Sequence, residues 1–575
     1  MYPCITMLGP LFQFDRSSIK EMPISRKDSL SPERDNTLPF IYDVIIVGAG
    51  PCGLATAARL REHTPSALFT DEEHHRYHWI KKHAANASIK SSKTGRIRSL
   101  GNPSQQQPRS RSEPSMLVLD NSGNEWLSKW KRLFSLLEIS HLRSPMFFHP
   151  DPHDRDGLLA YAHASGRECE CLEIAGCVGK ELSKHQMKKR RNKRKPGEQA
   201  RPTITIDERD RKDYFIPPAD LFESYCSFIA NRYDLQSPDL IQKASVSNIE
   251  YDYVPQLSPD EKLFTINTDG KTYFAKSVVL AVGAGNAPSV PRPFPQNGCP
   301  CACHAFQPLD DALQARVRAK KETNVLVIGG GLTSAQISDR AIRRGATKVH
   351  HIMRGPMKVK PFDVDLSWMG KFRNHEKASF WSADTDQERS ELIKSARGGG
   401  SITPRFSKLL AHHTTTNTLK IHTHTTITSA TFSPELQTWS LHTQPPIPHL
   451  PKFHYIYFAT GISSDVQTLP YLSTFREKYP IQSYDGLPAL TEDLMWREDV
   501  PLFMTGRFAA LRVGPGAANL EGARLGAERI VWGLQEVLGN WEGEEGEEEE
   551  QEELLSGEYR FAAGIGSRFE RLVEE

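Results

Sequence analysis

Three features that the sequence lacks narrow the class of protein. No apolar run reaches the roughly 18 residues that a membrane-spanning helix needs. The net charge is only +2 in 575 residues, so no overall basic field favours nucleic acid or an anionic membrane surface. The first residues carry no basic segment ahead of their apolar ones, so no secretory signal is expected. These absences predict a globular cytoplasmic protein that binds no nucleic acid and spans no membrane.

Pairs of cysteines with the spacing of a redox disulfide are also missing. Nine cysteines in 575 residues do not make a disulfide framework, and none of them forms a Cys-x-x-Cys pair. The stretch "CPCACH" (299–304) has the spacing Cys-x-Cys-x-Cys, which is tighter than ordinary zinc ligation prefers. A metal or a redox disulfide there is the less favoured interpretation, and we predict no metal site.

The first motif that carries chemistry is a glycine-rich loop in "DVIIVGAGPCGLATAARL" (43–60). An apolar strand precedes Gly48, Gly50 and Gly53, and a helix follows them. In such a loop the first glycine makes a tight turn, the second admits a pyrophosphate at the helix N-terminus, and the third lets helix and strand pack closely. A ribose-binding acid is expected about 20 residues further on, and Asp71 follows Gly48 by 71 − 48 = 23 residues. The motif predicts an adenine-dinucleotide site.

Two later stretches favour FAD as the dinucleotide in this first site. Thr460 and Gly461, in "FATG", end an apolar strand with a turn. Gly514 and Gly516 precede a helix that is predicted to begin near Asn519. The free N–H groups at that helix N-terminus would stabilise negative charge on a reduced flavin. An ordinary surface helix with a glycine entry is the alternative.

A second glycine loop lies in "NVLVIGGGLTSAQ" (324–336), where Gly329, Gly331 and Ser334 give the pattern G-x-G-x-x-S. The following strand, "KVHHIMRG", ends in Arg354 instead of an acid. An arginine there can pair with the 2′-phosphate of NADPH, where a carboxylate would accept from the 2′-hydroxyl of NADH. We predict an NADPH site, with a solvated strand end as the alternative for the arginine. Two such sites in one chain imply hydride transfer from NADPH to FAD.

The two loops, the later "ATG" and the absent redox dithiol together resemble the class B flavin-dependent monooxygenases. The sequence is most similar to the N-hydroxylating ornithine and lysine monooxygenases and to related fungal FAD/NAD(P)-binding proteins that carry "HLRSPMFFHPDP", over about residues 40–535. The resemblance implies that NADPH reduces FAD, that the flavin captures O2 as a hydroperoxide, and that an amine nitrogen takes the distal oxygen.

Three residues are candidates for contacts near the flavin. Asp363 and Asp365, in "KPFDVDLSWMGKF" (360–372), lie where the amine hydroxylases carry a substrate-contacting loop that includes an asparagine. Carboxylates would suit a cationic amine, and exposed loop acids are the alternative. Arg143, in "HLRSPMFF", is expected near the isoalloxazine or a phosphate of FAD, or in a structural role. No catalytic acid, base or nucleophile is predicted.

The predicted fold is α/β, with two Rossmann-like dinucleotide-binding domains of which the NADPH domain is inserted into the FAD domain. Flexible tails flank them. We expect a disordered tail at 1–38, the FAD domain at 39–318 and 452–540, the NADPH domain at 319–451, and an acidic tail with a short terminal segment at 541–575.

The predicted function is that of an FAD-containing, NADPH-dependent monooxygenase that N-hydroxylates a primary amine such as ornithine or lysine. Its partners are then a small amine and O2. An NADPH-dependent flavin oxidase or reductase without oxygenation and a non-enzymatic redox-sensing flavoprotein stay open as alternatives. A basic insertion at about 165–212 is interpreted as a solvated loop, and its cluster at 188–195 leaves a nuclear location as the alternative to the cytoplasm.

Overall fold

The computed structural model describes residues 39–62, 88–90, 97–99, 113–174, 177, 208–285, 288–296, 298–307, 311–369 and 373–538. The chain divides into the compact units Met1–Pro39 and Phe40–Glu575, and everything below concerns the second unit. The predicted tails, the basic cluster at 188–195 and Asp71 lie outside the described residues. Within those residues, no helix is both long and apolar enough to cross a bilayer.

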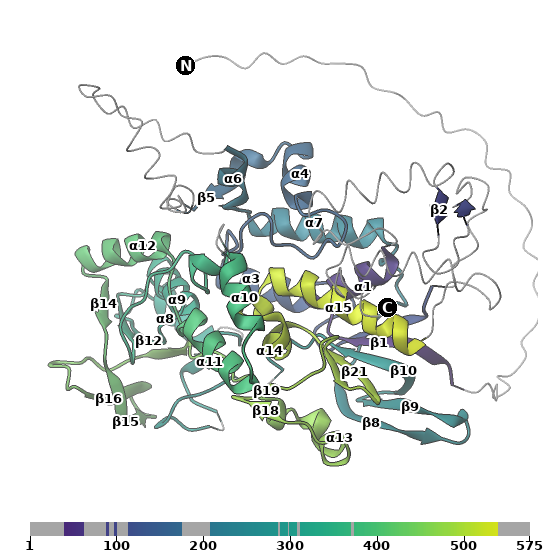
Figure 1. The fold of residues 1–575 in the computed structure, drawn as a ribbon. Helices are drawn as coiled ribbons and strands as arrows, with labels where there is room; N and C mark the ends of the chain where they lie inside the picture. The colour runs from purple at the N-terminus through teal and green to yellow at the C-terminus, as the bar shows by residue number, and fades with distance from the viewer. Residues whose placement is uncertain are drawn as a thin grey trace, which may run out of the picture. The chain divides into compact units, whose positions relative to one another are not determined.

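The first sheet contains the strand that leads into the first glycine loop (Figure 1). Its strand order is β20 (Met495–Arg497), β21 (Val500–Met504), β10 (Thr272–Leu280), β1 (Ile41–Val47), β4 (Met116–Asp120) and β7 (Ile241–Lys243). The pairs from β21 to β7 are parallel. The apolar residues 44–47 of β1 and 278–280 of β10 are buried, as strands covered on both faces require.

An antiparallel extension continues the first sheet beyond β10. It consists of β9 (Ser258–Thr268) and β8 (Val246–Val254). Asn267 pairs with Thr272 across the turn that contains Asp269 and Gly270. The turn residues determine the register here because glycine and aspartate suit a tight connection.

This part of the chain also contains helices. They are α1 (Pro51–Arg61), α3 (Ser128–Leu137), α4 (Gly157–Ala164), α6 (Glu208–Asp213), α7 (Ala219–Arg232) and α15 (Leu520–Leu538). α1 packs against α15 through Ala55, Ala523 and Ala527, whose small side chains allow the two backbones to approach closely. Contact between these helices brings the N-terminal loop and the C-terminal segment of the chain together.

The second sheet contains the strand that leads into the second glycine loop. Its strands are all parallel, in the order β11 (Ala302–His304), β17 (Tyr455–Phe458), β12 (Asn324–Ile328), β13 (Lys348–Ile352) and β14 (Leu419–His422). The elements beside it are α8 (Asp311–Arg318), α9 (Leu332–Arg343), α12 (Pro404–Thr415) and the hairpin of β15 (Thr426–Ser433) and β16 (Thr438–Gln444). Because β11 and β17 pair within this sheet, it extends beyond the predicted range 319–451 at both ends.

A group of short helices, which we call the helical lobe (366–397), leaves the second sheet and packs on the C-terminal part of the first. The lobe consists of a 3₁₀ turn (Leu366–Trp368), α10 (Arg373–Trp381) and α11 (Asp386–Arg397). It meets the 3₁₀ turns Gly506–Ala509 and Pro515–Ala518 and the helix α14 (Ala510–Val513) between them.

The remaining elements are short. They are β2 (Ser88–Lys90), β3 (Ile97–Ser99), β5 (Leu172–Glu173), β6 (Phe215–Ile216), α13 (Ser473–Lys478), β18 (Ser483–Tyr484), β19 (Leu487–Pro488), and 3₁₀ turns at Glu168–Glu170, Val466–Thr468 and Pro470–Leu472.

Candidate functional site

The three glycines of the first loop have three different surroundings. Gly48 has φ +113°, and a Cβ there would run into the carbonyl group of Ala281. A Cβ on Gly53 would collide with the carbonyl oxygen of Gly48. Gly50, the residue before α1, has nothing within 4 Å of the place where a Cβ would stand. Packing therefore excludes side chains at the first and third glycines, and the second faces open space at a helix N-terminus, where a pyrophosphate would fit.

An acid that the sequence reasoning missed stands beside this loop. β4 is the parallel neighbour of β1, and its last residue is Asp120. Asp120 Oδ2 accepts a hydrogen bond of 2.8 Å from the N–H of Ala49, and Oδ1 accepts one of 2.7 Å from Ser122. The end of the strand next to β1 is the position at which a Rossmann fold places its ribose-binding acid. The signal in the sequence is the apolar run "MLVLD", 120 − 48 = 72 residues after the first glycine.

The second loop repeats the arrangement of the first with one change. Gly329 has φ +152°, and a Cβ there would meet the carbonyl oxygen of Ala459. Gly331 is the residue before α9 and has an extended backbone. Ser334 replaces the third glycine, is fully buried, and donates its hydroxyl to the carbonyl oxygen of Gly331 at 2.6 Å. The serine thus satisfies its own polar group inside the helix–strand contact.

A buried histidine supports this loop from the neighbouring strand. His351 of β13 donates its Nε2–H to the carbonyl oxygen of Gly329 at 2.8 Å, and its Nδ1 lies 3.3 Å from the hydroxyl of Ser338. Burial lowers the pKa of His351 to about 4, so the ring is neutral near pH 7. The sequence reasoning did not single out His351, because a lone histidine in an apolar strand carries no motif.

Arg354 follows β13 by two residues and is exposed. With the residues that the structure describes, its guanidinium forms no hydrogen bond or ion pair, so it remains available to a ligand at the end of the strand beside β12. That strand end is the predicted position of the NADPH 2′-phosphate.

Thr460 and Gly461 follow β17 and therefore belong to the end of the second sheet. The hydroxyl of Thr460 donates to the carbonyl oxygen of Ser289, and the carbonyl oxygen of Gly461 accepts from the N–H of Ser289 at 3.2 Å. The same oxygen lies 3.1 Å from Nε2 of His304. Both residues thus join β17 to the segment around Ser289.

The segment from Gly514 to Asn519 meets the predicted substrate loop directly. Gly514 has φ +94°, and Asn519 stands immediately before α15, as predicted. The side-chain amide of Asn519 donates to Asp363 at 3.0 Å, and Arg397 of α11 donates to the other oxygen of Asp363 at 2.9 Å. Arg397 also donates to the carbonyl oxygen of Pro515 at 3.0 Å.

The other two candidates around this loop differ in their surroundings. Asp365 has a half-exposed side chain and forms an ion pair of 2.7 Å with Lys360. Arg143 is largely buried and donates to the carbonyl oxygens of residues 360, 361, 362 and 401, at distances of 2.5–3.3 Å. Desolvation lowers its pKa to about 10. Arg143 therefore fastens the substrate loop to the segment 141–148, which is the structural role left open by the sequence.

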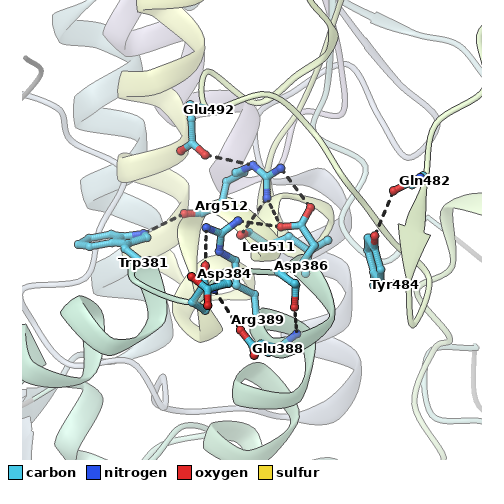
Figure 2. A network of polar contacts seen from close by, with 12 residues as sticks. Trp381, Asp384, Asp386, Glu388, Arg389, Gln482, Tyr484, Glu492, Leu511 and Arg512 are labelled. Atoms are coloured by element: carbon cyan, nitrogen blue, oxygen red, sulfur yellow. Dashed lines mark hydrogen bonds and ion pairs between the residues drawn. The ribbon is translucent and has the colours of Figure 1, made fainter.

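A charged network fastens the helical lobe to α14 (Figure 2). Arg512 of α14 lies against Asp386 of α11, with N–O distances of 2.5 and 3.2 Å, and Arg389 donates to the same carboxylate at 2.8 Å. The side chains of Arg512 and Asp386 are each 13% exposed. The indole N–H of Trp381 donates to the carbonyl oxygen of Arg512 at 3.2 Å. Partly buried ion pairs of this kind hold the lobe over the segment 514–519.

The stretch "CPCACH" contributes β11 and no metal-binding arrangement. Among the described residues, no group of three or more His, Cys, Asp or Glu side chains is placed to hold a metal ion.

Two parallel sheets, each with a glycine loop that leads into a helix, define a protein with two domains of the dinucleotide-binding kind. Residues 211–463 match the family described as L-lysine 6-monooxygenase/L-ornithine 5-monooxygenase, a match over less than half of the chain. A search of curated proteins finds no significant match.

Solved structures share the fold at low sequence identity. The ornithine N-hydroxylase of Kutzneria sp. 744 has a TM-score of 0.56 and 14% identity, covering 86% of this chain and 99% of that one. The ornithine hydroxylase of Pseudomonas aeruginosa has a TM-score of 0.54 and 15% identity, covering 87% and 100%. The L-lysine 6-monooxygenase of Pseudomonas syringae has a TM-score of 0.52 and 15% identity, covering 86% and 100%.

These comparisons confirm the predicted α/β fold and the resemblance to the N-hydroxylating class B flavin monooxygenases. They agree with the predicted class of enzyme, an oxidoreductase of the monooxygenase kind.

Proposed function

We propose that this protein is an FAD- and NADPH-dependent monooxygenase that N-hydroxylates a primary amine of a small cytoplasmic metabolite such as ornithine or lysine. The observation that carries the proposal is the closure of the helical lobe over the segment 514–519 in a chain with two dinucleotide loops. Among proteins of similar fold, the Kutzneria enzyme was solved with reduced FAD, NADP⁺ and L-ornithine, and a cadaverine monooxygenase from Erwinia amylovora was solved with FAD.

The first loop fits FAD because of its packing. Gly48 and Gly53 leave no room for a side chain, and Gly50 leaves open space at the N-terminus of α1. The first residue of that helix is Pro51, which has no N–H, so no donor is lost to a phosphate at this position. Asp120, at the end of β4, is the acid we assign to the ribose, in the place that the sequence spacing gave to Asp71. Its hydrogen bond from Ala49 ties the acid to the loop.

The second loop fits NADPH for a similar reason. Gly331 precedes α9, nothing within 4 Å surrounds the Cβ position of Gly330, and Ser334 is compatible with the helix because its hydroxyl is satisfied locally. Arg354 is the group we assign to the 2′-phosphate, since a guanidinium offers the planar fork that a phosphate accepts.

The chain contributes binding, orientation and exclusion of water to the reaction. When FAD is bound, its reduced ring supplies the electrons that activate O2. The helical lobe covers the segment before α15, and the contacts of Asp363 with Asn519 and Arg397 hold it there. Such a cover keeps bulk water from a reactive site.

The two loop acids have different parts in substrate binding under this proposal. Both oxygens of Asp363 are engaged, so Asp363 positions the loop. Asp365 is half exposed and is paired with one ammonium group, that of Lys360. A substrate ammonium can exchange with the ammonium of Lys360, because exposed ion pairs are weak.

The test uses the full-length chain purified with its flavin. NADPH consumption in air is measured with ornithine, lysine and cadaverine, and the product is examined by mass spectrometry for one added oxygen atom on the amine. Gly53→Val serves as the control, since it closes the FAD loop. Quantitative release of hydrogen peroxide with every amine and no oxygenated product would leave an NADPH oxidase instead. A purified protein that takes up no FAD would contradict both the monooxygenase and the oxidase function.

A further inference from the structure

A cavity of about 240 Å³ opens between α8 and α9, away from the second glycine loop. Its lining comes from α8, from the C-terminal half of α9, and from β12 and β17 of the sheet beneath. The nucleotide loop meets α9 at the opposite end, at Gly331. No residue of the loop Gly329–Ser334 lines the cavity. The cavity is thus separate from the predicted NADPH site, although both use α9.

The cavity is apolar along most of its length and cationic at one end. Leu313 and Val317 of α8 face Ile337 and Ala341 of α9 across it. The polar lining is mainly arginine: Arg318, Arg340 and Arg344. An apolar slot closed by guanidinium groups matches a molecule that has a hydrophobic body and an anionic head.

Arg340 is the most informative of these arginines, because it is 4% exposed and under-bonded. Its Nε donates to Glu138 at 3.3 Å. Its two Nη groups have no hydrogen-bond partner among the described residues. Neither Nη is among the fully buried nitrogens that lack a partner, so both stay accessible at the wall of the cavity, where they can donate to a ligand.

The charges around Arg340 leave an excess of positive charge. Glu138 is shared by three arginines, with Arg343 at 3.0 Å and Arg344 at 2.5 Å as well as Arg340. Asp339 pairs with Arg343 at 2.8 Å. Three guanidinium groups thus meet two carboxylates, and Arg343 takes a share of both. Arg340 and Arg344 line the cavity together with Arg318, whose described side-chain partner is the neutral amide of Gln314.

We propose that this cavity binds an amphipathic carboxylate, with the carboxylate on Arg340 and Arg344 and the apolar body between α8 and α9. An apolar cavity of about 150 Å³ accommodates benzene, so a cavity of this volume suits a body of roughly ten heavy atoms, such as a medium-chain or arylalkyl acid. A carboxylate matches the excess positive charge and the planar fork of arginine. The site lies outside the machinery of the proposed monooxygenase and does not depend on that function.

The experiment is calorimetric titration of the full-length chain, saturated with FAD and NADP⁺ so that both dinucleotide sites are filled. The probes are octanoate, 1-octanol and octylamine. Octanoate is expected to bind at least tenfold more tightly than 1-octanol, and octylamine is expected not to bind. Equal affinity for octanoate and 1-octanol, or no binding of octanoate, would overturn the proposal.

Three variants locate the binding. Ala341→Phe fills the cavity from α9 without touching a charge, and Arg340→Gln removes the buried guanidinium; each is expected to weaken octanoate binding at least tenfold. Lys321→Gln is the matched control, because Lys321 is an exposed cation beyond α8 that does not line the cavity, and it is expected to bind octanoate as the unaltered chain does. Thermal unfolding of each variant establishes that it is folded. Octanoate affinity that Ala341→Phe leaves unchanged would place the binding elsewhere and refute the assignment.

Discussion

Replacing Arg354 by alanine is the sharpest test of the second dinucleotide site. The side chain is exposed and forms no hydrogen bond or ion pair with the described residues, so its removal should change the free energy of unfolding by no more than about 0.5 kcal/mol. Hydrogen bonds to a charged group contribute about 1.5–3 kcal/mol, which is roughly a 10- to 150-fold change in affinity. The Arg354→Ala variant should therefore raise the KM for NADPH by that factor and leave the KM for NADH unchanged.

The assay is NADPH and NADH consumption by protein with equal flavin content. Arg354→Lys should fall between the unaltered chain and the alanine variant, because an ammonium keeps the charge but loses the fork. Lys420→Ala is the matched control, an exposed cation on the neighbouring strand β14. A ratio of the two KM values that stays the same in Arg354→Ala would refute the assignment of the 2′-phosphate to this residue.

Three further predictions concern the first loop, the second loop and the helical lobe. Asp120→Ala should weaken FAD binding at least tenfold while Asp71→Ala leaves it unchanged, as measured by the release of flavin fluorescence; the reverse pattern would restore Asp71 as the ribose acid. His351 has a folded pKa of about 4 against about 6.5 in an unfolded chain, so its stabilising contribution is complete above pH 6.5 and is lost as the pH falls toward 4. Denaturant unfolding should show about 2 kcal/mol less stability at pH 5 than at pH 8 from this residue, and His351→Gln should remove that part of the pH dependence. A double-mutant cycle of Arg512→Ala and Asp386→Ala should give a coupling energy of about 1–3 kcal/mol and faster proteolysis of the lobe; additive effects would show that the network does not hold the lobe.

Local sequence patterns predicted individual helices, strands and turns well, because each such element is determined largely by residues that are neighbours in the sequence. The two strand–glycine–helix units and the start of α15 near Asn519 lie where the sequence pattern placed them. Spacing alone identified Gly48, Gly53 and Gly329. The structure gives the reason for a glycine at each of them, because a Cβ there would strike the backbone of a neighbouring strand or turn.

Contacts between distant segments could not be predicted in this way. Nothing in the sequence around Arg143 shows that four carbonyl groups between residues 360 and 401 would surround its guanidinium. Likewise, the pairing of β11 and β17 with β12 depends on the order of strands in a sheet, which local periodicity does not encode. The predicted boundaries of the second domain missed those two strands for this reason.

The sequence by itself determined the class of the protein: two glycine loops with their flanking strands and helices, and no redox dithiol between them. Only the tertiary structure brought Asp120 to the first loop, where we propose it as the ribose acid. A spacing rule counts residues along the chain, and it selected Asp71. The sheet is built by strand pairing, and the strand that pairs with β1 is β4, which ends in Asp120. The two criteria differ because more than fifty residues separate α1 from β4, and a polypeptide can insert such a length between neighbouring strands without changing their register.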